Sequence, residues 1–292
     1  MIRSGLALVA VFSSVVYFFA SAQSPGRRGP IVRQVDHILV ESGDPRALFS
    51  FFAEVLQLPV AWPLAESPGY TSGGLGAGNV NLEIFQYADR KNAPARRIPQ
   101  AHFAGLAFEP YALSNALSEM KLRGIPQGSL EPYVSTLPKG SQGVLWTTVT
   151  LPSFSQPGMS LFLYEYSPEF LKVKVRREQL GNRLILNRGG PLGFQSVKEI
   201  VIAAANLQKA KVSWTQLLGE PTPSGTWRAG TGPAIRLIPG SVDQIRELIC
   251  KVESLDRAKA FLKKNRLLGS AALNELSLNP PNAQGLAIRL VN

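Results

Sequence analysis

The sequence contains 292 residues, of which 45% are hydrophobic and 17% are charged, and its formal net charge is +11. This composition excludes a highly charged disordered chain and provides enough apolar material for one large domain or two ordinary ones. One cysteine and two histidines exclude an intramolecular disulfide, a cysteine-rich zinc site and a three-histidine site within one chain. Any metal site must therefore use carboxylates.

The positive charge is distributed along the chain in short groups. The densest of these groups are residues 96–97, 172–177 and 263–264. A nucleic-acid-binding protein would gather its basic residues on one surface with aromatic residues between them. We therefore expect a solvated basic surface with a weak attraction to anionic ligands or surfaces, and no nucleic-acid partner.

The amino terminus has the pattern of a signal peptide. Arg3 precedes an uncharged apolar stretch at residues 6–20, and small residues end at Ala22. We expect cleavage after Ala22, secretion or export to the periplasm, and no stable membrane insertion after cleavage. The alternative is an uncleaved membrane anchor, although a spanning helix needs about 20 apolar residues. Residues 23–32 then form a flexible lead-in.

Beyond the lead-in, the first predicted unit has one strand, one helix and further strands. The strand lies at residues 35–41 and the helix at 46–56, where apolar residues recur with helical spacing. Further strands are expected near 59–64 and at 80–87. The glycine-rich residues 72–78 precede no helix and lack a phosphate-loop lysine, so we interpret them as a tight turn.

Three comparable units follow. The second has strands at residues 103–108, 144–151 and 159–166, with a helix at 111–123. The third and fourth units make up the second half of the chain. Their predicted strands are at residues 197–203, 234–238, 245–252, 273–278 and 285–291, and their predicted helices are at 207–218 and 255–268. His37 and Leu56 in the first unit have the same spacing as Glu199 and Leu218 in the third. Such a spacing indicates tandem duplication of a subdomain.

The segments VDHILVE, FFAEVLQL, GGLGAGN and NLEIFQY resemble the glyoxalase/bleomycin-resistance/extradiol-dioxygenase superfamily, also called the vicinal oxygen chelate proteins. The resemblance implies an α+β fold of βαβββ modules paired into half-open barrels. It covers residues 33–292 as four modules. The implied organisation is a first domain at 33–170, a linker at 171–191 and a second, degenerate domain at 192–292.

The resemblance also implies a metal site in the first domain. In metal-dependent members each module can contribute one ligand from its first strand and another from its last. The matching residues are His37, Glu83 and Glu165, with Glu165 also the candidate catalytic residue. In the second module the first-strand position is ambiguous between Phe103 and the neighbouring His102, because a shift of one residue turns a side chain to the other face.

A histidine and two carboxylates suit a single divalent iron, manganese, nickel or zinc ion. Such an ion would stabilise an enolate or bind a diol. The alternative is structural: His37 is a hydrogen-bonded strand residue, and Glu83 and Glu165 form ion pairs. Phe85 and Phe103 are expected to line a pocket for a small-molecule ligand or substrate, although core packing is the commoner role of such residues.

The equivalent positions of the second domain hold Glu199, Arg236, Glu247 and Arg289. A guanidinium group has only donors and remains protonated, so it cannot bind a cation. We therefore predict that these residues form ion pairs and that the second domain binds no metal.

Three functions remain open at this point. The first is an exported glyoxalase- or dioxygenase-like enzyme, namely a metal-dependent lyase, isomerase or dioxygenase acting on a small molecule with vicinal oxygens. The second is a metal-free binding protein that sequesters a small ligand, as bleomycin-resistance proteins do. The third is a purely structural or partner-binding role, because the second domain lacks the ligand pattern. Metal content separates the first two.

Overall fold

The computed structural model of the chain describes residues 30–88, 100–136, 140–168 and 171–292. The predicted signal peptide and most of the lead-in lie outside these residues, so neither is tested. Within the described part of the chain, no helix is long and apolar enough to cross a membrane.

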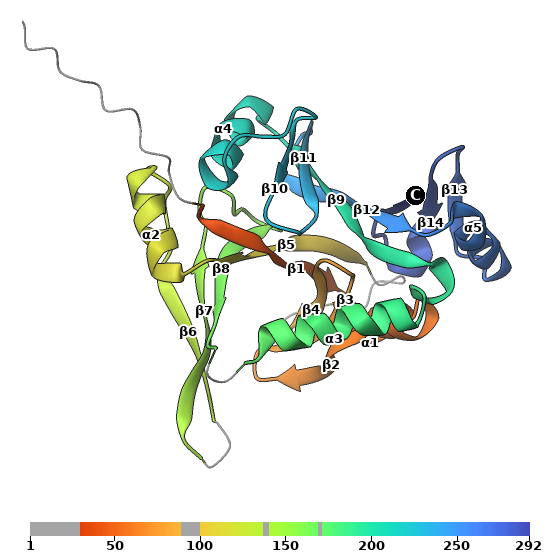
Figure 1. The fold of residues 1–292 in the computed structure, drawn as a ribbon, viewed down its shortest axis with the longest axis horizontal. Coiled ribbons are helices and arrows are strands. Elements are labelled where there is room, and N and C mark those ends of the chain that lie inside the picture. Colours follow the sequence, from red (N-terminus) through yellow and green to blue (C-terminus); the bar gives the residue numbers. More distant parts are fainter. Residues whose placement is uncertain (1–29, 89–99, 137–139, 169–170) are drawn as a thin grey trace, which may run out of the picture.

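The strands form two sheets, and we refer to the modules of the first sheet as the first domain and to those of the second sheet as the second domain; the domain boundaries remain a prediction. The first sheet has eight strands in the order β2-β3-β4-β1-β5-β8-β7-β6 (Figure 1). Two modules meet at the antiparallel pair of β1 and β5, and in each module the first strand runs parallel to the last. The strands are β1 (Val32–Ser42), β2 (Val60–Ser67), β3 (Tyr70–Gly76), β4 (Asn81–Tyr87), β5 (Ala101–Pro110), β6 (Leu130–Thr136), β7 (Gln142–Thr150) and β8 (Ser160–Tyr166).

The helices of these two modules lie between the first and second strands of each. In the first module, α1 (Pro45–Ser50) continues as a π-helix (Phe51–Val55). The Asp44 side chain accepts a hydrogen bond of 3.0 Å from the amide of Ala47, which fixes the start of α1. In the second module, α2 (Leu113–Leu122) has no side-chain cap of its own at Ala112.

The second domain is a seven-stranded sheet with the order β10-β11-β9-β12-β15-β14-β13. Its third module has two strands after the helix, whereas its fourth has three. The elements are β9 (Phe194–Ala204), α4 (Leu207–Leu218), β10 (Thr226–Arg228), β11 (Ala234–Pro239), β12 (Gln244–Val252), α5 (Leu255–Lys264), β13 (Leu268–Ala271), β14 (Leu276–Leu278) and β15 (Ile288–Val291), with short 3₁₀ turns at Gly190–Leu192 and Pro280–Ala283. The chain thus has the predicted α+β fold, with four modules in two curled sheets.

The two domains share an apolar core. Leu82 from the first sheet and Leu58 from the loop before β2 meet Leu248 and Leu290 from the second sheet. Cys250 lies in the same core and is buried, as its apolar surroundings in the sequence indicate. Burial raises the pKa of its thiol to about 12, so the thiol stays neutral.

The predicted linker contains a helix, α3 (Val173–Leu186), which packs beside β2 and β3 of the first domain (Figure 1). Leu180 and Leu184 are its buried residues. Gly76 makes room for the helix, because a Cβ atom there would lie 3.3 Å from the Cβ of Leu180. The side chain of Arg177, in the first half of α3, reaches back into the first domain.

The glycine-rich residues 72–78 were expected to form a tight turn, but most of them belong to strand β3. Their small size serves packing: a Cβ atom on Gly74 would lie 2.2 Å from the ring of Trp62, and one on Gly73 would lie 2.7 Å from Phe49. Strand β6 was not predicted. It is an edge strand that contains Pro132 and is exposed along most of its length. Its sequence therefore lacks the alternation of apolar and polar residues by which a half-buried strand is predicted.

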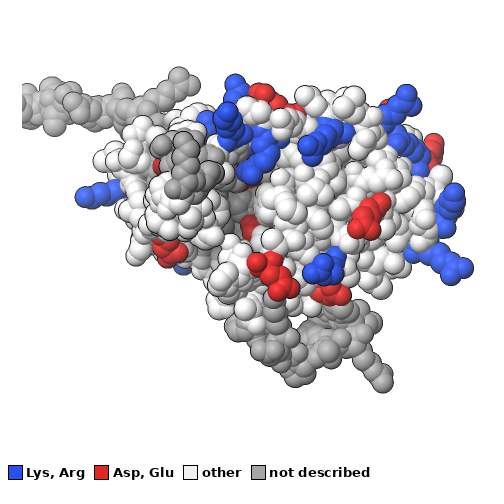
Figure 2. All heavy atoms as spheres, turned by 90° about the horizontal axis from the view of Figure 1, so that it is seen from below, with Lys and Arg blue, Asp and Glu red and all other residues white. Residues whose placement is uncertain are grey.

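Charged residues on the face seen in Figure 2 lie in several separate groups, and acidic residues are interspersed among the basic ones. On this face the excess of basic residues therefore forms no continuous patch.

Candidate functional site

A β-bulge in the central strand β1 creates the most unusual cluster of the first domain. Val35 pairs with Phe108 and His37 pairs with Ala107, so Asp36 has no partner of its own in this ladder. An extra residue of this kind interrupts the alternation of side chains along a strand. As a result, the side chains of the adjacent residues Asp36 and His37 lie on the same side of the strand and meet: Asp36 Oδ2 lies 2.6 Å from His37 Nδ1.

The other ring nitrogen of His37 faces the last strand of the same module. His37 Nε2 lies 3.1 Å from Glu83 Oε2. The two atoms make an ion pair, but the N–H group is not aligned for a hydrogen bond. Glu83 is held from its other side, because the Ser72 hydroxyl donates a hydrogen bond of 2.6 Å to Glu83 Oε1. His37 therefore lies between two carboxylates.

Asp36 joins this cluster to helix α3. Its carboxylate accepts a hydrogen bond of 2.8 Å from the hydroxyl of Tyr166 and another from the guanidinium of Arg177. Arg177 also forms an ion pair of 2.6 Å with Glu109, which in turn accepts a hydrogen bond from Arg33. A continuous polar network thus runs from Glu83 to Arg33 beneath α3.

Aromatic rings close the space around His37. The rings of Trp62, Phe162 and Tyr164 lie 6.5, 6.0 and 5.3 Å from the imidazole, centre to centre. Only 2% of His37 and 2% of Asp36 is exposed to solvent. A buried network of this kind requires that each charge has a partner, because burial of an isolated charge is costly.

The partners set the protonation states within the cluster. Burial by itself would lower the pKa of His37, but the hydrogen bond to Asp36 and the charges of Asp36 and Glu83 outweigh it and raise the pKa to about 9. Burial by itself would raise the pKa of Asp36, whereas His37 and Arg177 bring it down to about 2. At neutral pH His37 is therefore an imidazolium between two ionised carboxylates.

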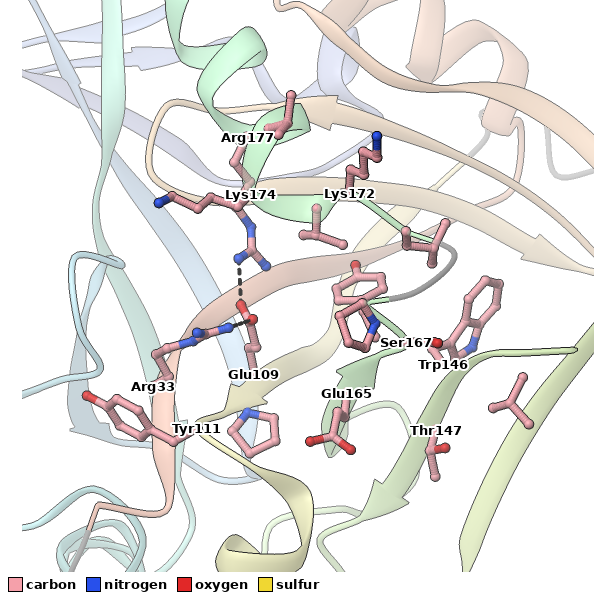
Figure 3. A pocket seen from close by; sticks show the side chains of 17 residues that line it. Arg33, Glu109, Tyr111, Trp146, Thr147, Glu165, Ser167, Lys172, Lys174 and Arg177 are labelled. Carbon is pink, nitrogen blue, oxygen red and sulfur yellow. Dashed lines mark hydrogen bonds and ion pairs between the residues drawn. The ribbon is translucent and has the colours of Figure 1, made fainter.

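A cavity of about 770 Å³ lies beside this network, at the start of α3 (Figure 3). Its lining combines charged residues from β1, β5, β8 and α3 with aromatic and apolar residues from β7 and β8. Seventeen residues line it, among them Arg33, Glu109, Tyr111, Val144, Trp146, Thr147, Glu165, Tyr166, Lys172, Lys174, Val175 and Arg177. Tyr166 and Arg177 thus contact both the cavity and Asp36.

The structure brings together two of the three predicted metal ligands, His37 and Glu83. It places Glu165 elsewhere: Glu165 Oε1 accepts a hydrogen bond of 2.7 Å from the amide of Leu113. Leu113 is the first residue of α2, so Glu165 caps a helix whose own cap residue, Ala112, supplies no side-chain hydrogen bond.

Strand pairing gives the equivalent positions of the second module directly. In the first module, Glu83 lies opposite the residue two positions after His37. In the second, Phe162 lies opposite the residue two positions after Gly105. The antiparallel β1–β5 ladder pairs His37 with Ala107 and Leu39 with Gly105, so exchanging the two strands places Gly105 where His37 lies. The positions equivalent to the His37–Glu83 pair are therefore Gly105 and Phe162, while Glu165 lies three residues further along β8.

Gly105 could not be exchanged for a larger residue on this backbone, because a Cβ atom would lie 1.9 Å from the carbonyl oxygen of Ser160. The two residues that the sequence offered for this position lie elsewhere on β5. Phe103 is buried in the core, and His102 is half-exposed with its Nε2 3.6 Å from Glu41 Oε2. Phe85, like Phe103, is buried and is not among the residues that line the large cavity.

As arranged, the described residues do not fit a three-ligand metal site. In the part of the chain that the structure describes, no three histidine, cysteine, aspartate or glutamate side chains are grouped so that they could hold an ion. Asp36 is positioned to orient His37, which is a common role for a carboxylate behind a metal-binding histidine, but a third ligand is missing from the cluster.

In the second domain the equivalent residues pair with one another. Arg236 Nε donates to Glu199, and Arg289 Nη2 donates to Glu247. Arg289 also contacts Glu275 at 2.8 Å, a partner that the sequence did not indicate. That this domain binds no metal remains a prediction.

Sequence reasoning missed the residues that join the cluster to the cavity: Asp36, Arg177 and Tyr166. The adjacency of Asp36 and His37 was visible in VDHILV, but strict strand alternation places neighbours on opposite faces. Only the bulge brings them together. Arg177 was assigned to a linker, and nothing in its local sequence indicates that it contacts the first strand.

This chain matches known proteins in its fold but not in its sequence. No protein-family model matches the sequence, and no curated protein sequence is significantly similar to it. Solved structures do match. A variant of homoprotocatechuate 2,3-dioxygenase from B. fuscum is 13% identical, with a TM-score of 0.59 over 92% of this chain and 73% of that one.

Two further structures agree with this match. The enzyme from Brevibacterium fuscum in complex with 3,4-dihydroxyphenylacetate has a TM-score of 0.56 at 11% identity, covering 92% of this chain and 82% of that one. The enzyme from Arthrobacter globiformis has a TM-score of 0.55 at 12% identity, covering 91% and 81%. At such low identity the likeness concerns the fold alone. The chain therefore has the fold of the extradiol dioxygenases, which are vicinal oxygen chelate proteins.

Proposed function

We propose that this chain is a small-molecule-binding protein with a dioxygenase-like fold, and that its first domain holds the ligand without a metal ion. The observation that carries the proposal is the cavity of about 770 Å³ next to the closed network around His37. Small-molecule sites commonly have volumes of about 300–1,000 Å³ and combine apolar walls with a few polar groups. The lining of this cavity has that composition.

The state of the His37–Glu83 pair supports binding in the cavity rather than chelation. A chelating site needs three ligands with open positions directed at the substrate. Here the two candidate ligands are paired with each other, and aromatic rings surround the histidine. The cavity, in contrast, is lined by Tyr166 and Arg177, and a ligand can occupy it while the network stays as it is.

One structural neighbour carries 3,4-dihydroxyphenylacetate, so this compound is a reasonable first ligand to test. The experiment is isothermal titration calorimetry with this compound and a panel of small aromatic acids, alcohols and amides, in buffer containing a chelator. We expect at least one compound to bind in the chelator and to raise the melting temperature. Glu199→Gln, a change in the second domain, serves as the control and should bind equally well.

The opposite outcome would point to the metal-dependent enzyme. If binding occurs only after iron, manganese, nickel or zinc is added, and His37→Gln abolishes it together with stoichiometric metal uptake, the metal-free proposal is wrong. If no compound binds under either condition, the binding function itself is wrong.

We also propose that the protein is exported, which rests on the sequence of residues 1–22. Mass spectrometry of the protein recovered outside the cytoplasm tests this proposal. The expected amino terminus is Gln23, and an intact Met1 on the exported protein would contradict cleavage.

A further inference from the structure

We propose that the cavity beside α3 selects an elongated ligand with an anionic group at one end and an aromatic ring at the other. This inference rests on the proposed function and assigns its ligand class. Figure 3 shows the arrangement: Arg33 and Lys174 lie on one side of the cavity, and Trp146 lies on the opposite side. The two ends of the cavity therefore offer different chemistry.

Arg33 is a fixed cation with donors to spare. Its Nη2 atom donates to Glu109, yet 47% of its side chain remains exposed. In the contacts that the structure describes, the Nε and Nη1 groups of Arg33 have no protein partner. A guanidinium held by one carboxylate and presenting its remaining N–H groups is well suited to bind a carboxylate, sulfonate or phosphate.

Glu109, which positions Arg33, is itself firmly held. It is buried, accepts a hydrogen bond of 2.6 Å from Gln34 and forms an ion pair of 2.6 Å with Arg177. Asp36 provides the second carboxylate for Arg177. Arg33 and Arg177 are thus balanced by Glu109 and Asp36, so the floor of the cavity is rigid and close to neutral.

The uncompensated positive charge lies at the rim. Lys172 and Lys174 line the cavity, and neither has an ion-pair partner among the described residues. Lys172 immediately precedes α3 and supplies no side-chain cap, so the positive end of the helix dipole adds to the two ammonium groups. An anion at this rim would meet Arg33, Lys174 and the first turn of α3.

The negative charge of Glu165 opposes binding of an anionic group at its own part of the cavity wall, and in this way it orients the ligand. Glu165 also lines the cavity (Figure 3), and its carboxylate accepts a hydrogen bond from the amide of Leu113. An anionic group is repelled from this part of the wall and attracted to Arg33 and Lys174. The charges of the lining therefore define one favourable direction for an anionic ligand.

The far wall is aromatic. The ring of Trp146 is stacked on Tyr133 at 4.1 Å and lies 5.7 Å from Tyr164, so it is held in place. Val144 and Val175 lie in the same lining, and both are exposed. A flat ring that covers these side chains would remove apolar surface from water and gain aromatic contacts.

Two dyes that differ by one charge provide the test. Anilinonaphthalene sulfonate carries an anionic group, and phenylnaphthylamine has the same ring system without it; both fluoresce when they leave water. We expect the full-length protein to bind the anionic dye about tenfold more tightly than the neutral one at low salt. Salt should reduce this difference, because it screens exposed charges.

Two variants locate the effect. Lys174→Gln removes a charge that makes no ion pair within the described residues, so the fold should be retained. It should weaken binding of the anionic dye about threefold to tenfold and leave the neutral dye unaffected. Arg33→Gln should have the same selectivity with a larger effect. Lys264→Gln, the same substitution on the exposed end of α5, is the control and should change neither.

The outcomes separate this inference from the proposed function. If both dyes bind equally well and Lys174→Gln has no effect on either, the anionic ligand class is wrong while the binding function stands. If the anionic dye binds more tightly but Lys264→Gln weakens it as much as Lys174→Gln, the preference comes from net charge and the assigned subsite is wrong. If neither dye binds the wild-type protein, both the ligand class and the cavity as a binding site are wrong.

Discussion

Both domains have a β-bulge immediately before the first-strand residue of a paired site, but the residues that form the pair differ. In the first, the bulge at Asp36 precedes His37, which meets Glu83 on the last strand of its module. In the second, bulges at the corresponding places in β9 and β12 precede Glu199 and Glu247, which meet arginines on the last strands. The fold therefore conserves the geometry of a first-strand and last-strand pair, whatever residues occupy it.

The difference lies in burial and in the number of partners. The pair of the first domain is enclosed by rings and shares its charges with Asp36 and Arg177. The pairs of the second domain are partly exposed and make fewer contacts. Because solvent weakens charge interactions, the first pair should matter much more for stability than the second. The following predictions test that difference.

The largest effect is expected from Asp36→Asn. This change removes the negative charge between His37 and Arg177, so the buried His37 and the partly buried Arg177 each lose one partner. Loss of one partner from a buried pair typically costs about 3–5 kcal/mol. Urea unfolding should show a loss of this size, with Glu199→Gln as the matched change in the second domain. A loss below about 1 kcal/mol would mean that the network relaxes easily.

The next effect concerns pH. The pKa of His37 is raised from 6.5 to about 9 in the folded protein, so its stabilising contribution is complete below pH 6.5 and is lost as the pH rises through 9. We expect the unfolding free energy to fall by about 3 kcal/mol between pH 6 and pH 10. Urea unfolding at several pH values measures it, and His37→Gln should flatten this part of the profile.

Asp36 affects the unfolding free energy in the acidic range, where its contribution is lost as the pH falls. Its pKa is lowered from 3.8 to about 2, so its contribution is present above pH 3.8 and is lost as the pH falls through 2. The contributions of both groups are therefore complete only between about pH 4 and 6.5. A stability maximum well above pH 7 would contradict the assignment of His37 as an imidazolium.

A smaller effect is expected from Glu165→Ala, which removes the cap of α2. Loss of a side-chain cap costs about 1 kcal/mol. The variant should unfold earlier in urea by that amount, and Glu165→Gln should recover part of the loss because its carbonyl oxygen can still accept from Leu113. If instead Glu165→Gln abolishes metal uptake at unchanged stability, Glu165 is a ligand, as the sequence resemblance implied.

The smallest effect is expected in the second domain. Glu199→Gln leaves Arg236 with a neutral partner at a site where about a third of the arginine side chain, 36%, is exposed. Exposed ion pairs contribute about 0.2–1 kcal/mol. Thermal unfolding should therefore change little, and the change should shrink further in high salt. An effect as large as that of Asp36→Asn would remove the contrast between the two domains.

The sequence by itself determined much of the architecture. The alternation of strands and helices, the common spacing from His37 to Leu56 and from Glu199 to Leu218, and the likeness of the first module to a known family gave the α+β modules and their number. The sequence also offered residue pairs at matching positions of three modules. Each of these depends on local periodicity and on residue spacing, which the chain carries before it folds.

Tertiary structure decided the chemistry of the site. The bulge that turns Asp36 towards His37 arises from the pairing of β1 with β5, and such a shift of register has no signature in a single strand. The β1–β5 and β5–β8 ladders give Gly105 and Phe162 the positions that the sequence assigned to other residues. Arg177 reaches Asp36 across 141 positions of the chain. Contacts of this range, and the cavity beside them, exist only once distant segments pack together.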